Sequence, residues 1–138
     1  MKKQYITNSL EETIELARKF ADSIDSGCII TLEGDLGVGK TSFTKGIGDS
    51  LGIEEPIVSP TFTLLKQYEG RLKLNHIDAY RLENMSSDTL GLYDLMDEDA
   101  IVVIEWSNFI DDMIISDYHI KIEYLDDTQR KIEIERKV

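Results

Sequence analysis

The chain has 138 residues, of which 41% are hydrophobic, enough to form the core of one domain. Its 27 acidic residues outnumber its 15 basic ones and give a net charge of −12, which argues against direct binding of nucleic acid, because such binding needs a basic surface. No apolar run reaches the roughly 18 residues of a membrane span, and no secretory signal is recognisable. The single cysteine excludes an internal disulfide. We therefore expect a cytoplasmic protein.

A short strand and a helix are the first predicted elements. Residues 4–7 are expected to form the strand. Ser9 and Glu12 make the S-x-x-E pattern of a capping box, which predicts a helix that begins after Ser9. Gly27 is expected to end this segment. The apolar positions that would form the buried face of the helix are Leu10, Ile14, Ala17, Ala21 and Ile24.

The next segment carries the most specific motif of the chain. Residues 34–41, Gly-Asp-Leu-Gly-Val-Gly-Lys-Thr, match the P-loop (Walker A) pattern G-x-x-x-x-G-K-[ST]. A β-branched apolar run at 28–32 precedes the motif, and a helical pattern over 40–51 follows it. Because strand, glycine-rich turn and helix are the context that the motif requires, the sequence predicts a phosphate-binding loop. An ordinary glycine-rich turn is the alternative.

The residue types of this loop suit a nucleoside triphosphate. Glycines let the backbone close around phosphate oxygens, and a helix N-terminus offers unpaired N–H groups and the positive end of a dipole. Lys40 adds a positive charge toward the β- and γ-phosphates, and Thr41 can place its hydroxyl on Mg2+.

A proline-containing loop and a hairpin are predicted next. Residues 53–62 hold both prolines and are interpreted as an extended loop, either near the nucleotide or simply connecting. Strand-like runs at 63–68 and 72–80 predict a hairpin. Asp78, near the end of the second run, is either a carboxylate directed at Mg2+ or a surface turn acid. His76 is interpreted as a hydrogen-bonded structural residue.

The last third of the chain predicts a weak helix at 86–95, a buried strand and a second hairpin. Four consecutive aliphatic residues within 100–106 indicate a parallel strand beside the P-loop strand. Glu105 at its carboxyl end could orient Mg2+ or an attacking water, or lie exposed at an edge. Residues 118–135 alternate as a hairpin, which puts His119 on the solvent side.

These elements predict an α/β fold in one domain over residues 1–138. The expected architecture is a mixed sheet like that of P-loop NTPases, with a parallel core, two antiparallel hairpins and helices on both faces.

Four motifs in order resemble one family closely. They are Gly-Asp-Leu-Gly-Val-Gly-Lys-Thr (34–41), Ser-Pro-Thr-Phe (59–62), His-Ile-Asp-Ala-Tyr-Arg (76–81) and Ile-Glu-Trp (104–106). Together they resemble the bacterial TsaE (YjeE) family, the small ATPase of tRNA threonylcarbamoyladenosine biosynthesis, over about residues 5 to 135.

The resemblance implies roles for particular residues. Lys40, Asp78 and Glu105 would be catalytic, and Thr41, Glu105 and Asp78 would hold Mg2+. Thr61 would sense the γ-phosphate within a switch-like loop. The residues implied to contact ATP or ADP are Thr7, Gly37, Val38, Gly39, Lys40, Thr41, Ser42, Thr61 and Trp106. Ser107 and Asn108 depart from the residues often found after Ile-Glu-Trp in the family, and we assign them no role.

The resemblance also implies partners. A TsaD-like and a TsaB-like protein would form the complex that transfers the threonylcarbamoyl group to the adenosine next to the anticodon, and this chain would bind and hydrolyse ATP to reset it. We expect hydrolysis to be slow alone and faster with partners, because no arginine is clearly placed as a finger in cis. Contact with tRNA would fall to the partners, in line with the acidic charge.

Three other functions remain possible from the residues alone. A small-molecule kinase usually has an arginine-bearing lid, and the sequence has no insertion of that size. A GTPase needs D-x-x-G after a strand and N-K-x-D, and neither is present in its context. A binding module gated by nucleotide, with incidental hydrolysis, is the third.

Overall fold

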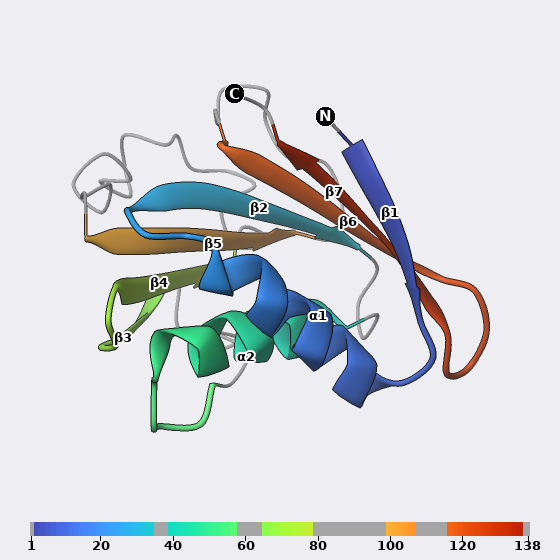
Figure 1. The fold of residues 1–138 in the computed structure, drawn as a ribbon, viewed down its shortest axis with the longest axis horizontal. Helices are drawn as coiled ribbons and strands as arrows, with labels where there is room; N and C mark the ends of the chain where they lie inside the picture. Colours follow the sequence, from blue (N-terminus) through green and yellow to red (C-terminus); the bar gives the residue numbers. More distant parts are fainter. Residues whose placement is uncertain (1, 35–38, 58–64, 79–98, 107–115, 137–138) are drawn as a thin grey trace.

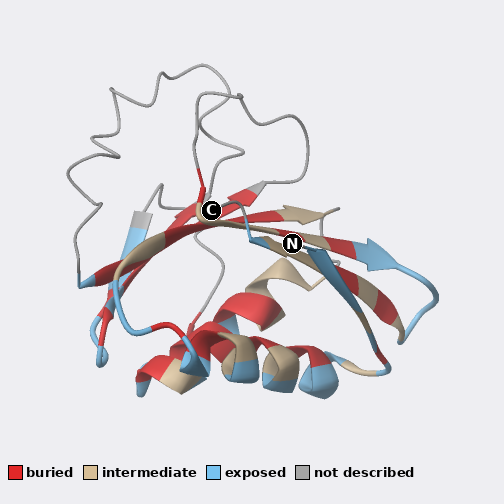
Figure 2. Ribbon diagram, turned by 45° about the horizontal axis from the view of Figure 1, so that its top comes forward, coloured by how far each residue is buried: buried red, intermediate tan, exposed pale blue. Residues whose placement is uncertain are grey.

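The computed structural model describes residues 2–34, 39–57, 65–78, 99–106 and 116–136. This part of the chain forms one seven-stranded sheet, with two helices side by side on one of its faces (Figures 1 and 2). Neither of these two helices is long and apolar enough to cross a membrane.

The sheet combines parallel and antiparallel pairs. Its strand order is β1-β7-β6-β2-β5-β4-β3; β2 pairs in parallel with β5 and β6, and β4 with β5, whereas β3–β4, β6–β7 and β1–β7 are antiparallel. The predicted parallel core and both hairpins are therefore confirmed. The elements are β1 (Lys2–Thr7), α1 (Leu10–Asp22), β2 (Cys28–Gly34), α2 (Lys40–Leu51), β3 (Leu65–Tyr68), β4 (Lys73–Asp78), β5 (Ala100–Trp106), β6 (Tyr118–Tyr124) and β7 (Arg130–Arg136).

Five strands end at the same edge of the sheet, among them β6, which pairs in parallel with β2 and ends at Tyr124. The parallel strands β2, β5 and β4 end at Gly34, Trp106 and Asp78. The pairings through β7 and β6 give β1 the same direction, so that Thr7 also ends there. Ligands of open α/β sheets bind outside the carboxyl ends of the strands, and this edge therefore holds the candidate site.

The start of α1 follows the prediction, but its end and part of its buried face do not. Ser9 caps the helix, since its Oγ accepts a hydrogen bond from the Glu12 amide at 3.1 Å. Leu10, expected to be buried, is 45% exposed because it lies in the first turn, at the end of the sheet. The helix ends at Asp22 rather than near Gly27. The buried residues of α1 are Thr13, Ala17 and Ala21.

The reason for the early end lies in Ser23. Its hydroxyl donates to the carbonyl of Phe20 at 2.8 Å, and the amide of the next residue, Ile24, donates to the carbonyl of Ala21 at 2.9 Å. These bonds satisfy carbonyls of the last turn, which otherwise have no intrahelical donor. A glycine is therefore not needed to stop the helix.

The two helices cross at a glycine. A β-carbon on Gly46 of α2 would overlap the carbonyl oxygen of Ile14 and the β-carbon of Ala17, both on α1. Only a residue without a side chain fits at this crossing, which holds α1 and α2 together over the sheet.

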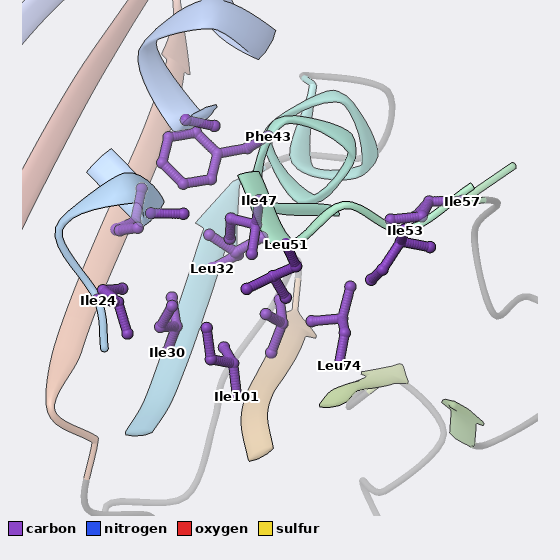
Figure 3. Packing of buried hydrophobic residues seen from close by; sticks show 14 of the residues in the cluster. Ile24, Ile30, Leu32, Phe43, Ile47, Leu51, Ile53, Ile57, Leu74 and Ile101 are labelled. Carbon is purple, nitrogen blue, oxygen red and sulfur yellow. The ribbon is translucent and has the colours of Figure 1, made fainter. Parts of the chain in front are cut away.

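The core fills the space between the helices and the sheet. Phe43, Ile47 and Leu51 follow one another at four-residue spacing along α2 and are almost fully buried. Figure 3 shows them on the side of α2 that faces Ile30 and Leu32 of β2. This packing fixes the axis of α2 and thus the place where the helix begins, at the edge with the candidate site.

Arg71 connects the carboxyl-terminal ends of both helices, which lie away from the candidate site. Its guanidinium donates to the carbonyls of Ala21 and Ile24 at 2.9 and 2.7 Å, and to the carbonyl and hydroxyl of Ser50 at 3.1 and 3.0 Å. A cation near a helix C-terminus is favourable because it meets the negative end of the dipole.

Both described helices lie on the same face of the sheet. The prediction of helices on both faces depends on residues 86–95, which lie outside the described residues.

Candidate functional site

The P-loop motif joins the end of β2 to the start of α2. Gly39, the residue before the helix, has φ +121°, a backbone conformation that favours glycine. No side chain caps the helix, and its first turn contains no acidic residue. The first N–H groups of a helix in general have no intrahelical acceptor, and a helix start of this kind suits the binding of an anion. Gly37 and Val38, also predicted to bind phosphate, lie outside the described residues.

Lys40 is held at the loop by the backbone. Its Nζ donates a hydrogen bond of 2.7 Å to the carbonyl oxygen of Gly34, the first residue of the motif. The bond places the positive charge at the junction of strand and helix, close to the first turn. Ser42 follows in that turn and is partly buried.

Glu105 meets the first turn of α2 from the neighbouring strand. The hydroxyl of Thr41 donates to Oε1 of Glu105 over 3.4 Å, a long hydrogen bond. Glu105 is 6% exposed, so its carboxylate is buried at the sheet edge. The alternative interpretation, a glutamate exposed at an edge, is therefore wrong. A hydroxyl and a carboxylate side by side next to a P-loop are two hard oxygen donors.

His76 of β4 completes this cluster, and sequence reasoning missed its part. Its Nε2 lies 3.0 Å from Oε2 of Glu105, without the alignment of a hydrogen bond. The imidazole is fully buried, and neither ring nitrogen has a hydrogen-bond partner within the described part of the chain. The interpretation of His76 as a hydrogen-bonded structural residue is therefore wrong. The sequence did contain a signal: His76 comes two residues before Asp78 on a strand, and residues two apart on a strand lie on the same face of the sheet.

Two other predicted residues reach the same edge with their backbones. Asp78 is opposite Glu105 in the parallel register of β4 and β5, and Trp106 is opposite Glu33 of β2. The side chains of Asp78 and Trp106 lie outside the described part of the structure, as does all of Thr61.

Thr7 ends β1 at this edge, with its side chain directed inward. It is 4% exposed, and its hydroxyl lies 2.8 Å from that of Thr13 on α1. The start of α1 approaches the loop nearby, since Leu10 Cδ2 lies 3.6 Å from the point where a β-carbon on Gly39 would stand. The structure thus brings the α1 N-terminus to the P-loop, while the Thr7 hydroxyl is engaged within the protein.

His119, expected on the solvent side, is partly buried. Its Nδ1 lies 2.7 Å from the hydroxyl of Thr31 and its Nε2 lies 2.9 Å from Oε1 of Glu33. Alternation along β2 puts these residues on the face of the sheet opposite the helices, away from the cluster of Thr41 and Glu105.

The family of the chain is decided by a match over nearly its whole length. A family model described as "Threonylcarbamoyl adenosine biosynthesis protein TsaE" matches residues 7–136. The chain belongs to the TsaE family. Similar curated proteins carry the name tRNA threonylcarbamoyladenosine biosynthesis protein TsaE: one from Bacillus subtilis is 41% identical over 88% of this chain and 78% of its own, and one from Aquifex aeolicus is 36% identical over 98% and 97%.

A solved structure agrees in fold. The crystal structure of YdiB from Bacillus subtilis superposes with a TM-score of 0.83 at 33% identity, covering 99% of this chain and 86% of that one. The predictions of a P-loop-like α/β fold and of the TsaE family are therefore confirmed. The family is involved in tRNA threonylcarbamoyladenosine biosynthesis.

The described oxygen donors fit Mg2+ bound together with a nucleotide. Within the described residues no three His, Cys, Asp or Glu side chains form a group that could hold a metal by themselves. Mg2+ is usually held by one or two protein ligands together with substrate phosphates and water, so the pair of Thr41 and Glu105 suits this mode better than a metal cage.

Proposed function

We propose that this TsaE-family protein binds ATP at the P-loop and hydrolyses it slowly. It would associate with TsaD-like and TsaB-like proteins in a nucleotide-dependent way. Through this association it would support tRNA threonylcarbamoyladenosine modification next to the anticodon. Mg2+ would be the metal, and tRNA would be contacted only through the partners. Cytoplasmic location remains part of this proposal.

The observation that carries the proposal is the meeting of three groups at the carboxyl edge of the sheet. The Lys40 ammonium, the Thr41 hydroxyl and the Glu105 carboxylate come from the start of α2 and the end of β5. A cation, an uncapped helix N-terminus and oxygen donors for a metal are what a nucleoside triphosphate requires.

The chain's own residues suggest a division of work. Lys40 and the amides of the first turn would bind phosphate oxygens and stabilise the charge that develops on the transferred phosphoryl group. Thr41 and Glu105, with Asp78 as a second candidate, would hold the metal and orient water. Mg2+ held there by Thr41 and Glu105 would neutralise part of the charge on the phosphates.

Three of the described arginines are engaged within the protein, which supports slow hydrolysis by the isolated chain. Arg18 pairs with two acids of its own helix, Arg71 caps two helix ends, and Arg130 donates to two turn carbonyls and lies 4.3 Å over the Tyr124 ring. Arg81 lies outside the described residues. An arginine finger is worth about 10^3 to 10^5 in rate, so a partner that supplies one would accelerate the reaction strongly.

Two measurements test the proposal. The first is the fluorescence of Trp106, the only tryptophan, during titration with ADP, ATP and GTP, with and without Mg2+. We expect a saturable change with adenine nucleotides that Lys40→Ala removes. A response to GTP alone would contradict ATP as the ligand, and isothermal titration calorimetry covers the case in which the indole does not report binding.

The second measurement is ATP turnover with and without purified TsaD-like and TsaB-like proteins. Faster turnover in the mixture supports a subunit stimulated by its partners. Equal turnover would contradict that part of the proposal and favour a nucleotide-gated binding module in which hydrolysis is incidental.

A further inference from the structure

His76 is a fully buried polar side chain whose contacts within the described residues do not explain its burial. Both ring nitrogens are without an aligned hydrogen-bond partner there. Removing such nitrogens from water costs free energy unless they find a partner, and most buried polar atoms have one. A buried imidazole at this position therefore suggests a role that the sheet alone does not require.

The surroundings of His76 point to Glu105. In the parallel register of β4 and β5, His76 is opposite Val103, and Glu105 follows two residues later on the same face of the sheet. The imidazole Nε2 reaches diagonally to Oε2 of Glu105, 3.0 Å away. The other oxygen, Oε1, faces the Thr41 hydroxyl. The carboxylate is thus contacted from β4 through one oxygen and from α2 through the other.

We propose that His76 is a positioning residue: its buried imidazole, with Nε2 3.0 Å from Oε2 of Glu105, holds this carboxylate so that Oε1 stays beside Thr41, where the Mg2+ of the bound nucleotide would lie. The proposal rests on the proposed function, because it concerns the same nucleotide site. A metal-directed carboxylate that is itself held by an outer partner loses less freedom on binding the ion, and removal of such a partner typically costs about 10- to 100-fold in metal affinity.

The other histidine provides a matched comparison. His119 also places Nε2 beside a glutamate, 2.9 Å from Oε1 of Glu33, but on the opposite face of the sheet. Its side chain is 23% exposed, whereas that of His76 is 0% exposed. Replacing His119 removes an equivalent His–Glu contact without touching Glu105 or Thr41.

The variants distinguish the effect of a nitrogen placed near Glu105 from the effect of the buried volume of the side chain. His76→Leu fills the buried volume but has no N–H. His76→Gln carries an amide nitrogen at the distance of Nε2 and can still reach Oε2 of Glu105. His76→Asn carries its amide nearer the backbone, at the distance of Nδ1, and does not reach. His119→Leu is the control.

The experiment is calorimetric titration of each full-length variant with ADP, once with Mg2+ and once with a chelator. The readout is the dissociation constant measured with the chelator divided by the dissociation constant measured with Mg2+. This ratio reports how much the metal contributes to ADP binding, and it requires no turnover. We expect His76→Leu and His76→Asn to lower this ratio about 10-fold and leave the metal-free affinity unchanged. His76→Gln should retain most of the wild-type ratio, and His119→Leu all of it.

The outcomes distinguish this proposal from the proposed function. Equal losses of affinity with and without Mg2+ would mean that His76 supports the fold only, and an unchanged ratio in every variant would overturn the proposal directly. If His76→Leu does not fold, the comparison of His76→Gln with His76→Asn decides. A wild-type protein that binds ADP without any effect of Mg2+ overturns the role of His76 alone, whereas one that binds no nucleotide overturns the proposed function and this inference with it.

Discussion

The ammonium of Lys40 donates a hydrogen bond of 2.7 Å to the carbonyl oxygen of Gly34, so the lysine of the P-loop motif is bonded to the first residue of the same motif. A charged hydrogen bond of this kind contributes about 1.5–3 kcal/mol at most to stability. It also keeps the charge next to the first turn of α2.

Lys40→Ala should therefore affect ligand binding far more than folding. We expect the affinity for ATP to fall about 100-fold or more, because a partly buried cation facing phosphate is lost. The free energy of unfolding should fall by no more than about 3 kcal/mol. Calorimetric titration and urea unfolding measure the two effects. Lys45→Ala, an exposed lysine of the same helix, should leave both nearly unchanged.

Gly46→Ala should destabilise the protein, although alanine is the better helix former. In an exposed helix the change would stabilise by about 1 kcal/mol. Here the added methyl group overlaps Ile14 and Ala17 of α1, and such overpacking costs about 1–3 kcal/mol. Thermal or urea unfolding shows whether the substitution lowers or raises the free energy of unfolding, and the direction of this change decides the test. Asp49→Ala, exposed on the same helix, is the control, and an increase in stability for Gly46→Ala would contradict the close crossing.

Cys28 should react slowly with thiol reagents in the folded protein. Burial, with the nearby charge of Asp117 as a smaller cause, raises the pKa of the Cys28 thiol to about 12 from an ordinary value of 9.0. Since the thiolate is the reactive form, we expect labelling at about pH 8 to be at least about 100-fold slower than in denaturant. The same single thiol in the unfolded chain is the control. Equal rates in both states would contradict the burial.

Local patterns carried the successful predictions. The P-loop motif, the apolar run before it and the spacing of Phe43, Ile47 and Leu51 are each set by a few neighbouring residues, and the structure confirms the strand and the helix. The hairpins follow from alternation with short turns between the strands.

Contacts between distant segments account for what the sequence could not predict. His76 and Glu105 meet only because β4 and β5 pair in parallel, and no short-range pattern specifies that register. The guanidinium of Arg71 reaches the ends of both helices for a similar reason. Leu10 fits the helical period but lies in the first turn beside Gly39, so the period alone gave the wrong burial.

The turn between β6 and β7 should contribute to stability in a pH-dependent way. The amides of Gln129 and Thr128 donate to Oδ1 of Asp126 at 2.7 and 2.9 Å, and these bonds hold the pKa of the Asp126 carboxyl below its ordinary value of 3.8. A lowered pKa means that the folded state releases this proton more readily than the unfolded one. The stabilisation is therefore fully present above the ordinary pKa and is lost as the pH falls through the lowered value.

Asp126→Asn tests this dependence, because the amide keeps an acceptor oxygen in the same place but carries no charge. We expect the variant to melt at a lower temperature than wild type near pH 6, and the difference to narrow as the pH falls below 3.8 and through the lowered pKa of Asp126, where the wild-type carboxylate becomes protonated. Thermal unfolding at a series of pH values measures it. Asp127→Asn removes an exposed charge from the same turn and controls for the change in net charge. A difference between Asp126→Asn and wild type that stays constant over this range would show that the charge of Asp126 does not hold the turn.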